Sequence, residues 1–474
     1  MSDKAYTYFA TTSGMCRECR RIVRAQIVFE GGKVYQERIC PEHGASRALI
    51  AADQDWYLAA VREPMAADKP RLVSTKVEKG CPFDCGICAF HEQKCNLPVF
   101  SITNACNLRC PICFTYNRKD KIYFKTKEEM GRLLDWIVEA AGPVDLINVT
   151  GGEPTLHPEL LSLLELAKRP EIGRVTLNSN GLTLAKDPDL VKRLKDLGIY
   201  VILSFDTFDP ETAKRIHGLD VVEAKLKALE NLRKHDVPTT ILNVLIKGVN
   251  DSELPRILKM ALDEDFIRSL TVQTMTFTGY GGKGFSPREH ITIDETEKIV
   301  EAGASGRIRA SDFMPLPSAH PLCYGICYLF GSKSEEVVPL LRVVSKEELR
   351  EALKGGYLLH PDGRFEKALK QGMDLLWANS SGSDEAAIQL KTLKGILKKL
   401  YPPGESHTVF ERQKLGERHT KTIYVHAHMD EDNFDTARAV KCPDMVPDES
   451  RKLRPACTYN LFYRQKDERF WVDE

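Results

Sequence analysis

The chain has 474 residues, enough for about two to four domains of ordinary size with a large hydrophobic core. Its 67 Lys and Arg residues balance its 67 Asp and Glu residues, so no overall positive charge favours a nucleic-acid partner, and we expect none. The first residues lack the apolar core of a signal peptide, and no run of about 18 apolar residues occurs. We therefore expect a cytoplasmic protein, in which clustered cysteines are metal ligands rather than disulfides.

The first cysteines of the chain predict a site for a single metal ion. Cys16 and Cys19 are separated by two residues, and Cys40 and His43 are spaced in the same way. Three sulfurs and one imidazole complete a tetrahedral set for one zinc or iron ion, and this set does not choose between the two metals. We assign residues 1–75 to this mononuclear-metal domain.

The next four cysteines predict an auxiliary iron–sulfur cluster. Cys81, Cys85, Cys88 and Cys95 lie within 15 residues and supply four thiolates, enough for every iron of a 4Fe-4S cube. Buried unreactive thiols are the alternative, but four cysteines this close together are usually bound to metal. We expect residues 76–97 to carry this cluster.

A third group of cysteines predicts a cluster with one open iron. Cys106, Cys110 and Cys113 form a Cys-x3-Cys-x2-Cys loop, which would hold three of the four irons of a 4Fe-4S cube. The fourth iron would then be open to a ligand that is not a protein thiolate.

Residues 98–310 alternate short β-branched runs with longer amphipathic segments, a pattern typical of repeated βα units around a parallel sheet. We expect an α/β partial barrel of about six units, open on one side, with a helix over residues 127–140. The expected strands are 98–103, 144–149, 174–178, 200–205, 239–246 and 270–275. In such sheets the chemistry gathers at the carboxyl ends of the strands, and the triad of cysteines follows the first strand.

The loop after the second expected strand also fits a binding site. Gly151 and Gly152 let backbone groups approach a ligand closely, and Glu153 can accept a hydrogen bond from an ammonium group. A lone Gly-Gly-Glu-Pro sequence would be a turn and little more. Its position one βα unit after the cysteine triad makes it a more specific sign of a binding site.

The end of the chain predicts a second auxiliary 4Fe-4S cluster, in a C-terminal domain over residues 311–474. Four cysteines remain for it, and more than 100 residues separate the first two from the last two: Cys323, Cys327, Cys442 and Cys457. Ordinary core cysteines are the alternative, and His320 could replace one of the thiolates.

These motifs together resemble the radical SAM superfamily, whose members use S-adenosylmethionine (SAM). The cysteine triad matches its cluster loop, Phe114 matches the aromatic residue that follows, and residues 151–154 match the motif that holds the SAM amino group. The resemblance implies a partial TIM barrel, SAM bound to the open iron, and a radical that removes hydrogen from an unactivated carbon. It also implies contacts to the ribose and carboxylate of SAM from later strand ends, at Asn178, Ser204 and Asp206.

A narrower resemblance covers nearly the whole chain. The segments CRECR, CPEHG, KGCPFDCGIC, SAHPLCYGIC and ACTYN are similar to those of archaeal tetraether lipid synthase and its bacterial relatives. This resemblance implies a rubredoxin-like mononuclear iron, three 4Fe-4S clusters, and an anaerobic transferase that joins two lipid chains through a carbon–carbon bond. Its partners would be the lipid substrate and reduced ferredoxin or flavodoxin as electron donor.

Other functions share parts of this pattern. Related radical SAM methylases have a similar cysteine framework, so methylation of a pterin or another small molecule is the alternative. A carrier of electrons would not need the Gly-Gly-Glu-Pro loop, and a zinc-dependent interaction protein would not need the open cysteine triad. Long apolar tunnels would favour lipid chains, whereas a short cavity with polar groups would favour a pterin.

One further segment bears on the lipid hypothesis. Residues 386–400 form a basic amphipathic stretch that could make a peripheral contact with the inner membrane surface, where a lipid would be collected. An ordinary helix that buries its leucines and exposes its lysines is the alternative.

Overall fold

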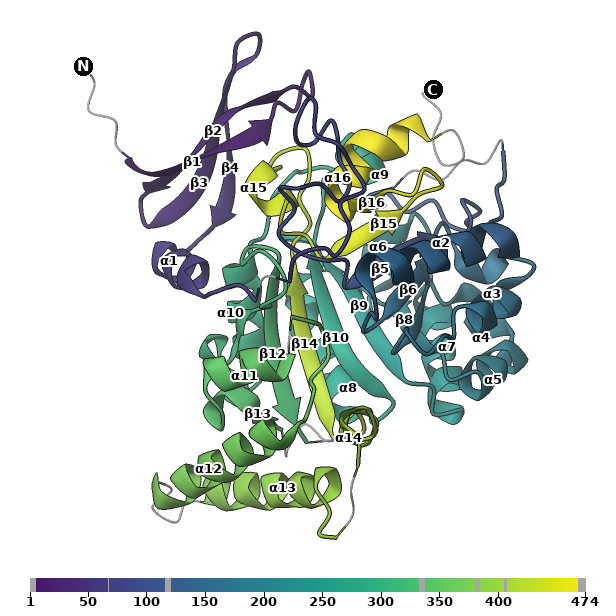
Figure 1. Ribbon diagram of the computed structural model, residues 1–474, viewed down its shortest axis with the longest axis vertical. Helices are drawn as coiled ribbons and strands as arrows, with labels where there is room; N and C mark the ends of the chain where they lie inside the picture. Colours follow the sequence, from purple (N-terminus) through teal and green to yellow (C-terminus); the bar gives the residue numbers. More distant parts are fainter. Residues whose placement is uncertain are drawn as a thin grey trace.

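Two sheets organise the chain, a four-stranded antiparallel sheet near the N-terminus and a twelve-stranded sheet formed by later strands (Figure 1). The computed structural model describes residues 6–66, 68–115, 121–331, 337–353, 355–379, 384–404 and 407–467.

The N-terminal sheet places the first predicted ligands at one end. Its strands pair in chain order and are β1 (Thr7–Met15), β2 (Ile22–Glu30), β3 (Lys33–Cys40) and β4 (Gly44–Ala51), followed by α1 (Gln54–Arg62). Because neighbouring strands run in opposite directions, the β1–β2 and β3–β4 turns lie at the same end. These two turns hold the Cys16–Cys19 pair and the Cys40–His43 pair, so the sheet brings both pairs together.

All six expected strands of the parallel sheet are present, and each pairs in parallel with the next. They are β5 (Leu97–Ser101), β6 (Ile147–Thr150), β7 (Val175–Ser179), β8 (Tyr200–Ser204), β9 (Thr239–Leu245) and β10 (Ile267–Thr274). The predicted α/β architecture is confirmed. The expected boundaries differ by a few residues because strand ends depend on pairing as well as on side-chain type.

Helices connect these strands and cover the outer face of the sheet (Figure 1). They are α2 (Lys127–Ala141), α3 (Leu160–Leu166), α4 (Leu182–Lys186), α5 (Pro188–Asp196), α6 (Pro210–His217), α7 (Val222–Lys234), α8 (Leu254–Asp263), α9 (Gly279–Gly284) and α10 (Ile293–Gly303). The expected helix over 127–140 is α2. It begins after Thr126, whose hydroxyl accepts from the Glu129 backbone N–H, and it buries Met130 and Leu134 completely.

The barrel strands alternate between an apolar outer face and an inner face that lines a cavity. On β6, Ile147 and Val149 belong to the main hydrophobic core under the helices, whereas Asn148 and Thr150 line the inner cavity. On two neighbouring strands the inward positions also include apolar side chains, Ile202 on β8 and Leu242 on β9. The interior of the barrel therefore combines hydroxyl and amide groups with apolar side chains.

The C-terminal region extends this sheet at both edges. β14 (Thr420–His426) pairs in parallel with β10, and β12 (Tyr324–Phe330) pairs antiparallel with β14. At the other edge, β15 (Asp444–Pro447) pairs with β5. The short strands β11 (Met314–Pro315), β13 (Val338–Pro339) and β16 (Leu453–Pro455) complete the sheet. The predicted boundary at residue 310 thus divides strands that share one sheet.

The remaining helices pack against the lower part of the sheet in Figure 1. They are α11 (Lys346–Leu353), α12 (Gly363–Asn379), α13 (Asp384–Leu400) and α14 (Val409–Gly416), with the short α15 (Thr436–Ala439) and α16 (Ala456–Thr458) elsewhere. α13 contains the amphipathic stretch, and its Leu393, Ile396 and Leu400 are buried in a second core shared with β12. The packed-helix alternative is confirmed, so this helix does not support the predicted membrane contact.

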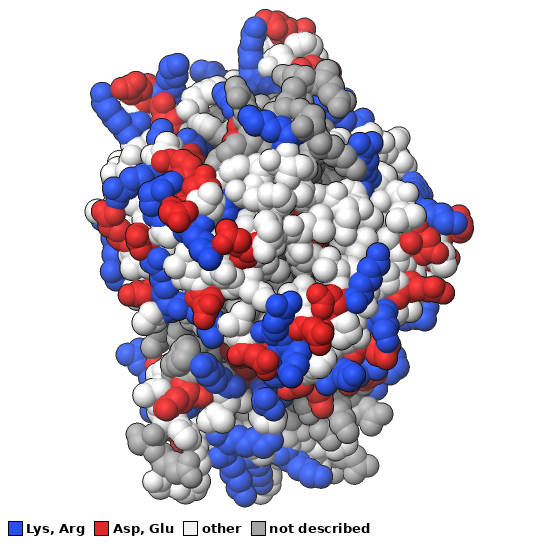
Figure 2. Space-filling model, turned by 90° about the vertical axis from the view of Figure 1, so that its right-hand side faces the viewer, with Lys and Arg blue, Asp and Glu red and all other residues white. Residues whose placement is uncertain are grey.

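No helix in the described ranges is long and apolar enough to cross a membrane. The face beside α3 to α5 is shown in Figure 2, where acidic and basic side chains are mixed around an uncharged central area. Basic side chains gather mainly at the lower end of this view.

The N-terminal sheet rests on a segment near the end of the chain. Thr12 donates to Asp435, and the Gln36 amide donates to the Phe434 carbonyl at 3.2 Å. Arg20 pairs with Glu431 at 2.9 Å. The predicted N- and C-terminal domains are therefore in direct contact.

Candidate active site and metal centres

The N-terminal site has the dimensions of a tetrahedral metal centre. The ligand atoms of Cys16, Cys19, Cys40 and His43 all lie within 4.8 Å of one another. Cys19 Sγ is 3.8 Å from Cys40 Sγ, and His43 Nδ1 is 3.7 Å from Cys16 Sγ and 3.5 Å from Cys40 Sγ. A tetrahedron with metal–sulfur bonds of about 2.3 Å has edges of about 3.8 Å. The predicted set thus fits one ion, with His43 as the fourth ligand.

The open triad lies at the predicted place, in the loop after β5. Cys106, Cys110 and Cys113 all line the inner cavity of the barrel. Burial raises the pKa of the Cys110 thiol, with Cys113 adding to the rise. A metal ion reverses this effect because a coordinating thiol is deprotonated on binding. The three thiols therefore fit the predicted 4Fe-4S cluster.

A buried polar network contacts the thiol of Cys110. His217 Nδ1 lies 3.6 Å from Cys110 Sγ, and its Nε2 lies 3.1 Å from Asp206. Lys225 is 3.9 Å from the same carboxylate. Although burial alone would raise it, His217 and Lys225 hold the pKa of Asp206 below its usual value. Hydrogen bonds to the cysteine sulfurs of a cluster tune its reduction potential. This network lies beside Cys110, where it would influence the potential of the predicted 4Fe-4S cluster.

The glycine pair after β6 is required by close packing against the cluster loop. A Cβ on Gly151 would lie 2.3 Å from the Thr103 carbonyl oxygen, and one on Gly152 would lie 2.2 Å from the Ala105 carbonyl oxygen. The Gly152 N–H donates to Thr103 at 2.8 Å. The two loops are thereby joined, and any side chain at either glycine would separate them.

Glu153 lines the inner cavity and is held in place by hydrogen bonds. It is buried, and its carboxylate accepts from the Thr155 N–H and hydroxyl, from the Ser179 hydroxyl at 2.9 Å and from the Asn180 N–H at 2.7 Å. These donors use both carboxylate oxygens, so Glu153 fixes the loops after β6 and β7 relative to each other. Its role as an acceptor for the SAM amino group stays a prediction.

The other predicted SAM contacts divide into two groups. Asn178 and Ser204 line the inner cavity, as do Gly151 and Gly152. Asp206 is buried near Cys110 and is not among the residues that line the cavity, so its contact with SAM stays a prediction. Ser204 is held by Lys225, whose ammonium donates to its hydroxyl at 2.8 Å.

The first auxiliary set is brought together only in part. Cys81, Cys85 and Cys88 lie close enough for their thiols to interact electrostatically. Cys95 is completely buried beside Asp444 and Met445 instead. Burial and the Asp444 carboxylate raise the pKa of Cys95. The structure thus groups three of the four predicted thiols.

The second auxiliary set also contains three neighbours and one outlier. Burial raises the pKa values of Cys442 and Cys457, and the nearby Cys323 adds to both rises. Arg438 donates to Cys323 Sγ at 3.5 Å. Cys327 is in the middle of β12 and faces the main core. Four residues of extended strand span about 13 Å, so Cys323 and Cys327 do not reach one cube.

His320 is not needed as a replacement for the fourth thiolate. Its Nδ1 accepts from the Leu322 backbone N–H at 3.1 Å. A different histidine, His428, has its Nδ1 3.4 Å from Cys457 Sγ and lines the inner cavity. The sequence signal for His428 is the His-Ala-His repeat at the end of β14, because a spacing of two places both imidazoles on one face.

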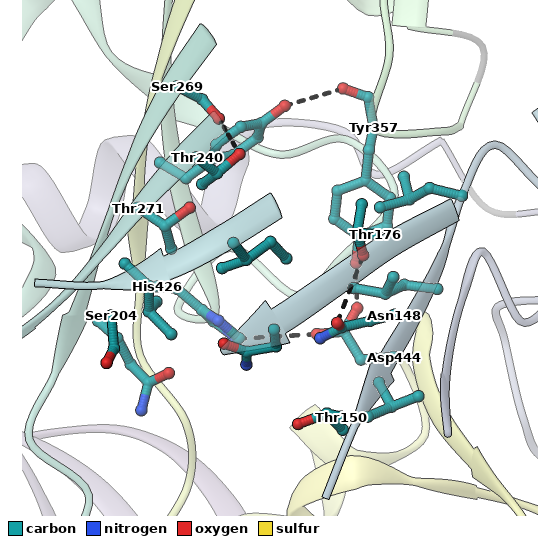
Figure 3. Close-up of a pocket in the computed structure, with 18 of the residues that line it drawn as sticks. Asn148, Thr150, Thr176, Ser204, Thr240, Ser269, Thr271, Tyr357, His426 and Asp444 are labelled. Atoms are coloured by element: carbon teal, nitrogen blue, oxygen red, sulfur yellow. Dashed lines mark hydrogen bonds and ion pairs between the residues drawn. The ribbon is translucent and has the colours of Figure 1, made fainter. Parts of the chain in front are cut away.

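The inner cavity begins at the cysteine triad. It has a volume of about 450 Å³ and extends from the cysteine triad along the inner face of the sheet. Figure 3 shows polar side chains from several strands around it. Its hydroxyl and amide groups include Ser101, Asn148, Thr150, Thr176, Asn178, Ser204, Thr240, Ser269, Thr271, Gln273 and Thr422. Apolar side chains such as Leu242, Leu359 and Phe365 complete the wall, so the cavity offers both polar and apolar contacts.

One carboxylate of the cavity was missed at the level of sequence. Asp444 accepts from the Tyr324 hydroxyl at 2.6 Å and from the Tyr357 hydroxyl, and it lies 3.7 Å from His426. Burial raises the pKa of Asp444 to about 6, against the two hydrogen bonds. The position of Asp444 two residues after a predicted ligand, Cys442, was the only local signal.

Comparisons with known proteins agree with the barrel and with the ribbon. Residues 100–261 match the family model of the radical SAM superfamily, and residues 8–52 match that of the HMPTM N-terminal zinc ribbon domain. The 7,8-dihydro-6-hydroxymethylpterin dimethyltransferase of Methanocaldococcus jannaschii is 29% identical, over 97% of this chain and 95% of that protein.

Two further relatives match only part of the chain. The GTP 3′,8-cyclase of Chlorobaculum tepidum is 34% identical over 37% of this chain and 51% of that protein. The crystal structure of Streptococcus suis SuiB bound to its precursor peptide SuiA has a TM-score of 0.38 and 20% identity, over 45% of this chain and 46% of that one.

These findings correct the narrower resemblance. The relative that aligns with almost the entire chain is a pterin dimethyltransferase, so the predicted coupling of lipid chains and the predicted lipid partner are wrong. The error arose because the cysteine framework, on which the resemblance depended, is shared by enzymes with different substrates. Residues 100–261 thus form a radical SAM domain, and residues 8–52 form an N-terminal zinc ribbon.

Proposed function

We propose that this enzyme methylates a reduced pterin, replacing a hydrogen on carbon by a methyl group that comes from SAM. The observation that carries the proposal is the end-to-end alignment with the 7,8-dihydro-6-hydroxymethylpterin dimethyltransferase, which covers 97% of this chain. The HMPTM zinc ribbon match over residues 8–52 adds the same assignment for the N-terminus.

The lining of the cavity is compatible with a pterin. Its wall carries hydroxyl and amide groups, such as Asn148 on β6 and Thr176 on β7, beside apolar side chains such as Ile202 on β8 and Leu242 on β9. A pterin has donors and acceptors along its edges and two flat apolar faces, so it can use both kinds of contact.

The residues around the cavity fit the cofactors of the superfamily. Cys106, Cys110 and Cys113 would hold a 4Fe-4S cluster, and the loop at Gly151 and Gly152 would hold SAM through its backbone. When bound, the cluster and SAM supply an electron and a carbon radical that removes hydrogen from the substrate. The protein orients the reactants and encloses them in the barrel, away from water.

The other centres are part of the same proposal. We assign one auxiliary cluster to Cys81, Cys85 and Cys88. We assign a second one to three cysteines of the C-terminal region, Cys323, Cys442 and Cys457. With the triad cluster, this makes three 4Fe-4S clusters and one mononuclear zinc or iron. Reduced ferredoxin or flavodoxin is the proposed electron donor.

The proposal is tested with anaerobically purified enzyme, dithionite, SAM labelled with deuterium in its methyl group, and 6-hydroxymethyl-7,8-dihydropterin, the pterin in the relative's name. Mass spectrometry should detect deuterated methyl groups on the pterin together with 5′-deoxyadenosine. The Cys110→Ala variant should form neither product, because the cluster loop loses a ligand.

Cys327→Ala is the matched control, since Cys327 is a buried cysteine on the far face of β12. It should retain both products. Formation of 5′-deoxyadenosine without any methylated pterin would contradict the proposed substrate while leaving the radical chemistry intact.

A further inference from the structure

Asp444 is a buried carboxylate without a cationic partner. It is 4% exposed and lines the inner cavity. Within the described ranges no Lys or Arg nitrogen forms an ion pair with it, and its nearest basic group is His426, at 3.7 Å. A buried carboxylate without a Lys or Arg partner is typical of a binding site.

The protein orients this carboxylate through neutral donors. The Tyr324 hydroxyl donates at 2.6 Å to Oδ2, and the Tyr357 hydroxyl donates to Oδ1. Each carboxylate oxygen has two lone pairs, so one acceptor site on each oxygen remains after these bonds. The two tyrosines thus hold the carboxylate in place through neutral hydrogen bonds. Figure 3 shows Asp444 at the cavity wall with Tyr357 and His426.

The other carboxylates of the cavity are already paired. Glu153 accepts from several donors of its own loops. Glu417 pairs with Arg174 and accepts from the Tyr200 hydroxyl. Among the acidic residues that line the cavity, Asp444 is the one whose charge is left for a ligand.

A row of aromatic rings connects Asp444 with the cluster loop. Phe114, which follows Cys113, stacks on His428 with centroids 5.5 Å apart. His428 lies 4.0 Å from His426, and His426 stacks on Tyr324 at 3.9 Å with an angle of 13° between the rings. Tyr324 and His426 cover each other's faces, so the row offers mainly ring edges for contact with a flat heterocycle in the cavity.

We propose that Asp444 binds the edge of the pterin that carries the exocyclic amino group and the adjacent ring N–H. These two parallel donors match the two free acceptor sites of the carboxylate, as a guanidinium group does. The edge bound at Asp444 is opposite the side of the ring that would extend along the aromatic row toward the cysteine triad. Asp444 would thereby select the ring and direct its reactive side. This inference rests on the proposed function.

Binding in the absence of turnover provides the test. The dissociation constant of 6-hydroxymethyl-7,8-dihydropterin, the pterin named in the relative, is measured anaerobically by fluorescence for wild type and Asp444→Asn. A second probe is the matching dihydrolumazine, in which an oxygen replaces the exocyclic amino group. Wild type should bind the pterin at least about tenfold more tightly than the lumazine, and Asp444→Asn should lose this preference.

Asp294→Asn is the control, because Asp294 is an equally buried carboxylate outside the cavity that accepts from the Ala52 backbone N–H. It should keep the preference. Iron content and SAM affinity show whether Asp444→Asn retains its fold and its clusters. If either falls, Asp444→Glu, which keeps the charge, should restore part of the preference.

The outcomes separate the inference from the proposed function. Wild type that binds neither probe would contradict the proposed function itself. Wild type that binds the pterin, with an unchanged preference in Asp444→Asn, would overturn the role of Asp444 and leave the function in place.

Discussion

At the scale of single residues, cysteine position rather than cysteine spacing decides which thiols share a centre. Cys327 lies in the middle of β12 with its side chain in the main core, whereas Cys323 precedes the strand. An x3 spacing keeps two thiols close in a loop, as at Cys106 and Cys110, but separates them in an extended strand.

This difference predicts distinct iron contents for two cysteine variants. Cys442→Ser should lower the iron content by up to about four atoms per chain, because a cube that loses a ligand is readily lost. Cys327→Ser should keep the iron content of wild type and lose only packing energy, about 1 kcal/mol. Iron and sulfide analysis of anaerobically purified proteins checks this. An equal loss of iron in both variants would show that Cys327 is a cluster ligand.

At the scale of elements, one buried carboxyl group connects α1 with α10. Glu297 on α10 is 2% exposed and accepts from the Trp56 indole N–H at 2.8 Å. Burial raises the pKa of Glu297 to about 8, from a usual value of 4.5. The contact between these helices therefore depends on a protonated carboxyl group at neutral pH.

The sign of the pH dependence follows from this shift. Between the unfolded and folded pKa values the native state keeps a proton that the unfolded state has lost, so stability falls as pH rises through this window. From about pH 6 to about pH 8, wild type should lose about 2 kcal/mol through this group. Glu297→Gln should remove that loss, and apparent melting temperatures at the two pH values measure it.

Glu289→Gln serves as the control for this comparison, because Glu289 is an exposed carboxyl group nearby in the chain. It should keep the pH dependence of wild type. An identical pH dependence in Glu297→Gln would show that the α1–α10 contact does not depend on the protonated group.

At the scale of the whole molecule, the zinc ribbon supports the segment that leads to the C-terminal cysteines. The Gln36 amide donates to the Phe434 carbonyl, and Arg38 donates to the Met15 carbonyl at 3.1 Å within the ribbon. Phe434 is completely buried in a small core with Met15. Metal binding at one end of the ribbon should therefore stabilise a distant part of the chain.

Removal of the ribbon metal tests this coupling. Cys19→Ser should lose one metal ion per chain and raise hydrogen exchange in residues 429–435, because the ribbon that covers them is loosened. Exchange in α5, on the far side of the barrel, should stay unchanged. Unchanged exchange in residues 429–435 after metal loss would contradict the coupling.

Much of the architecture follows from local sequence. The βα alternation predicted all six barrel strands, because period and length are properties of each segment. The metal set at Cys16, Cys19, Cys40 and His43 was also readable, since two short turns at adjacent hairpins need no distant partner. The loop spacing of the cysteine triad, together with the glycine pair after β6, indicated radical SAM chemistry in the same way.

What the tertiary structure alone decided involves contacts between distant residues. Cys95 lies beside Asp444, and Cys327 lies in the main core. Each position is set by the packing of the surrounding segment and not by the spacing of the cysteines. β12, β14 and β15 joined the barrel sheet from the C-terminal region, which no local pattern specifies. Asp444 reached the cavity by that route. Residue types and their spacing indicate which chemical groups the chain contains. Pairing between strands that lie hundreds of residues apart determines which of these groups line the cavity.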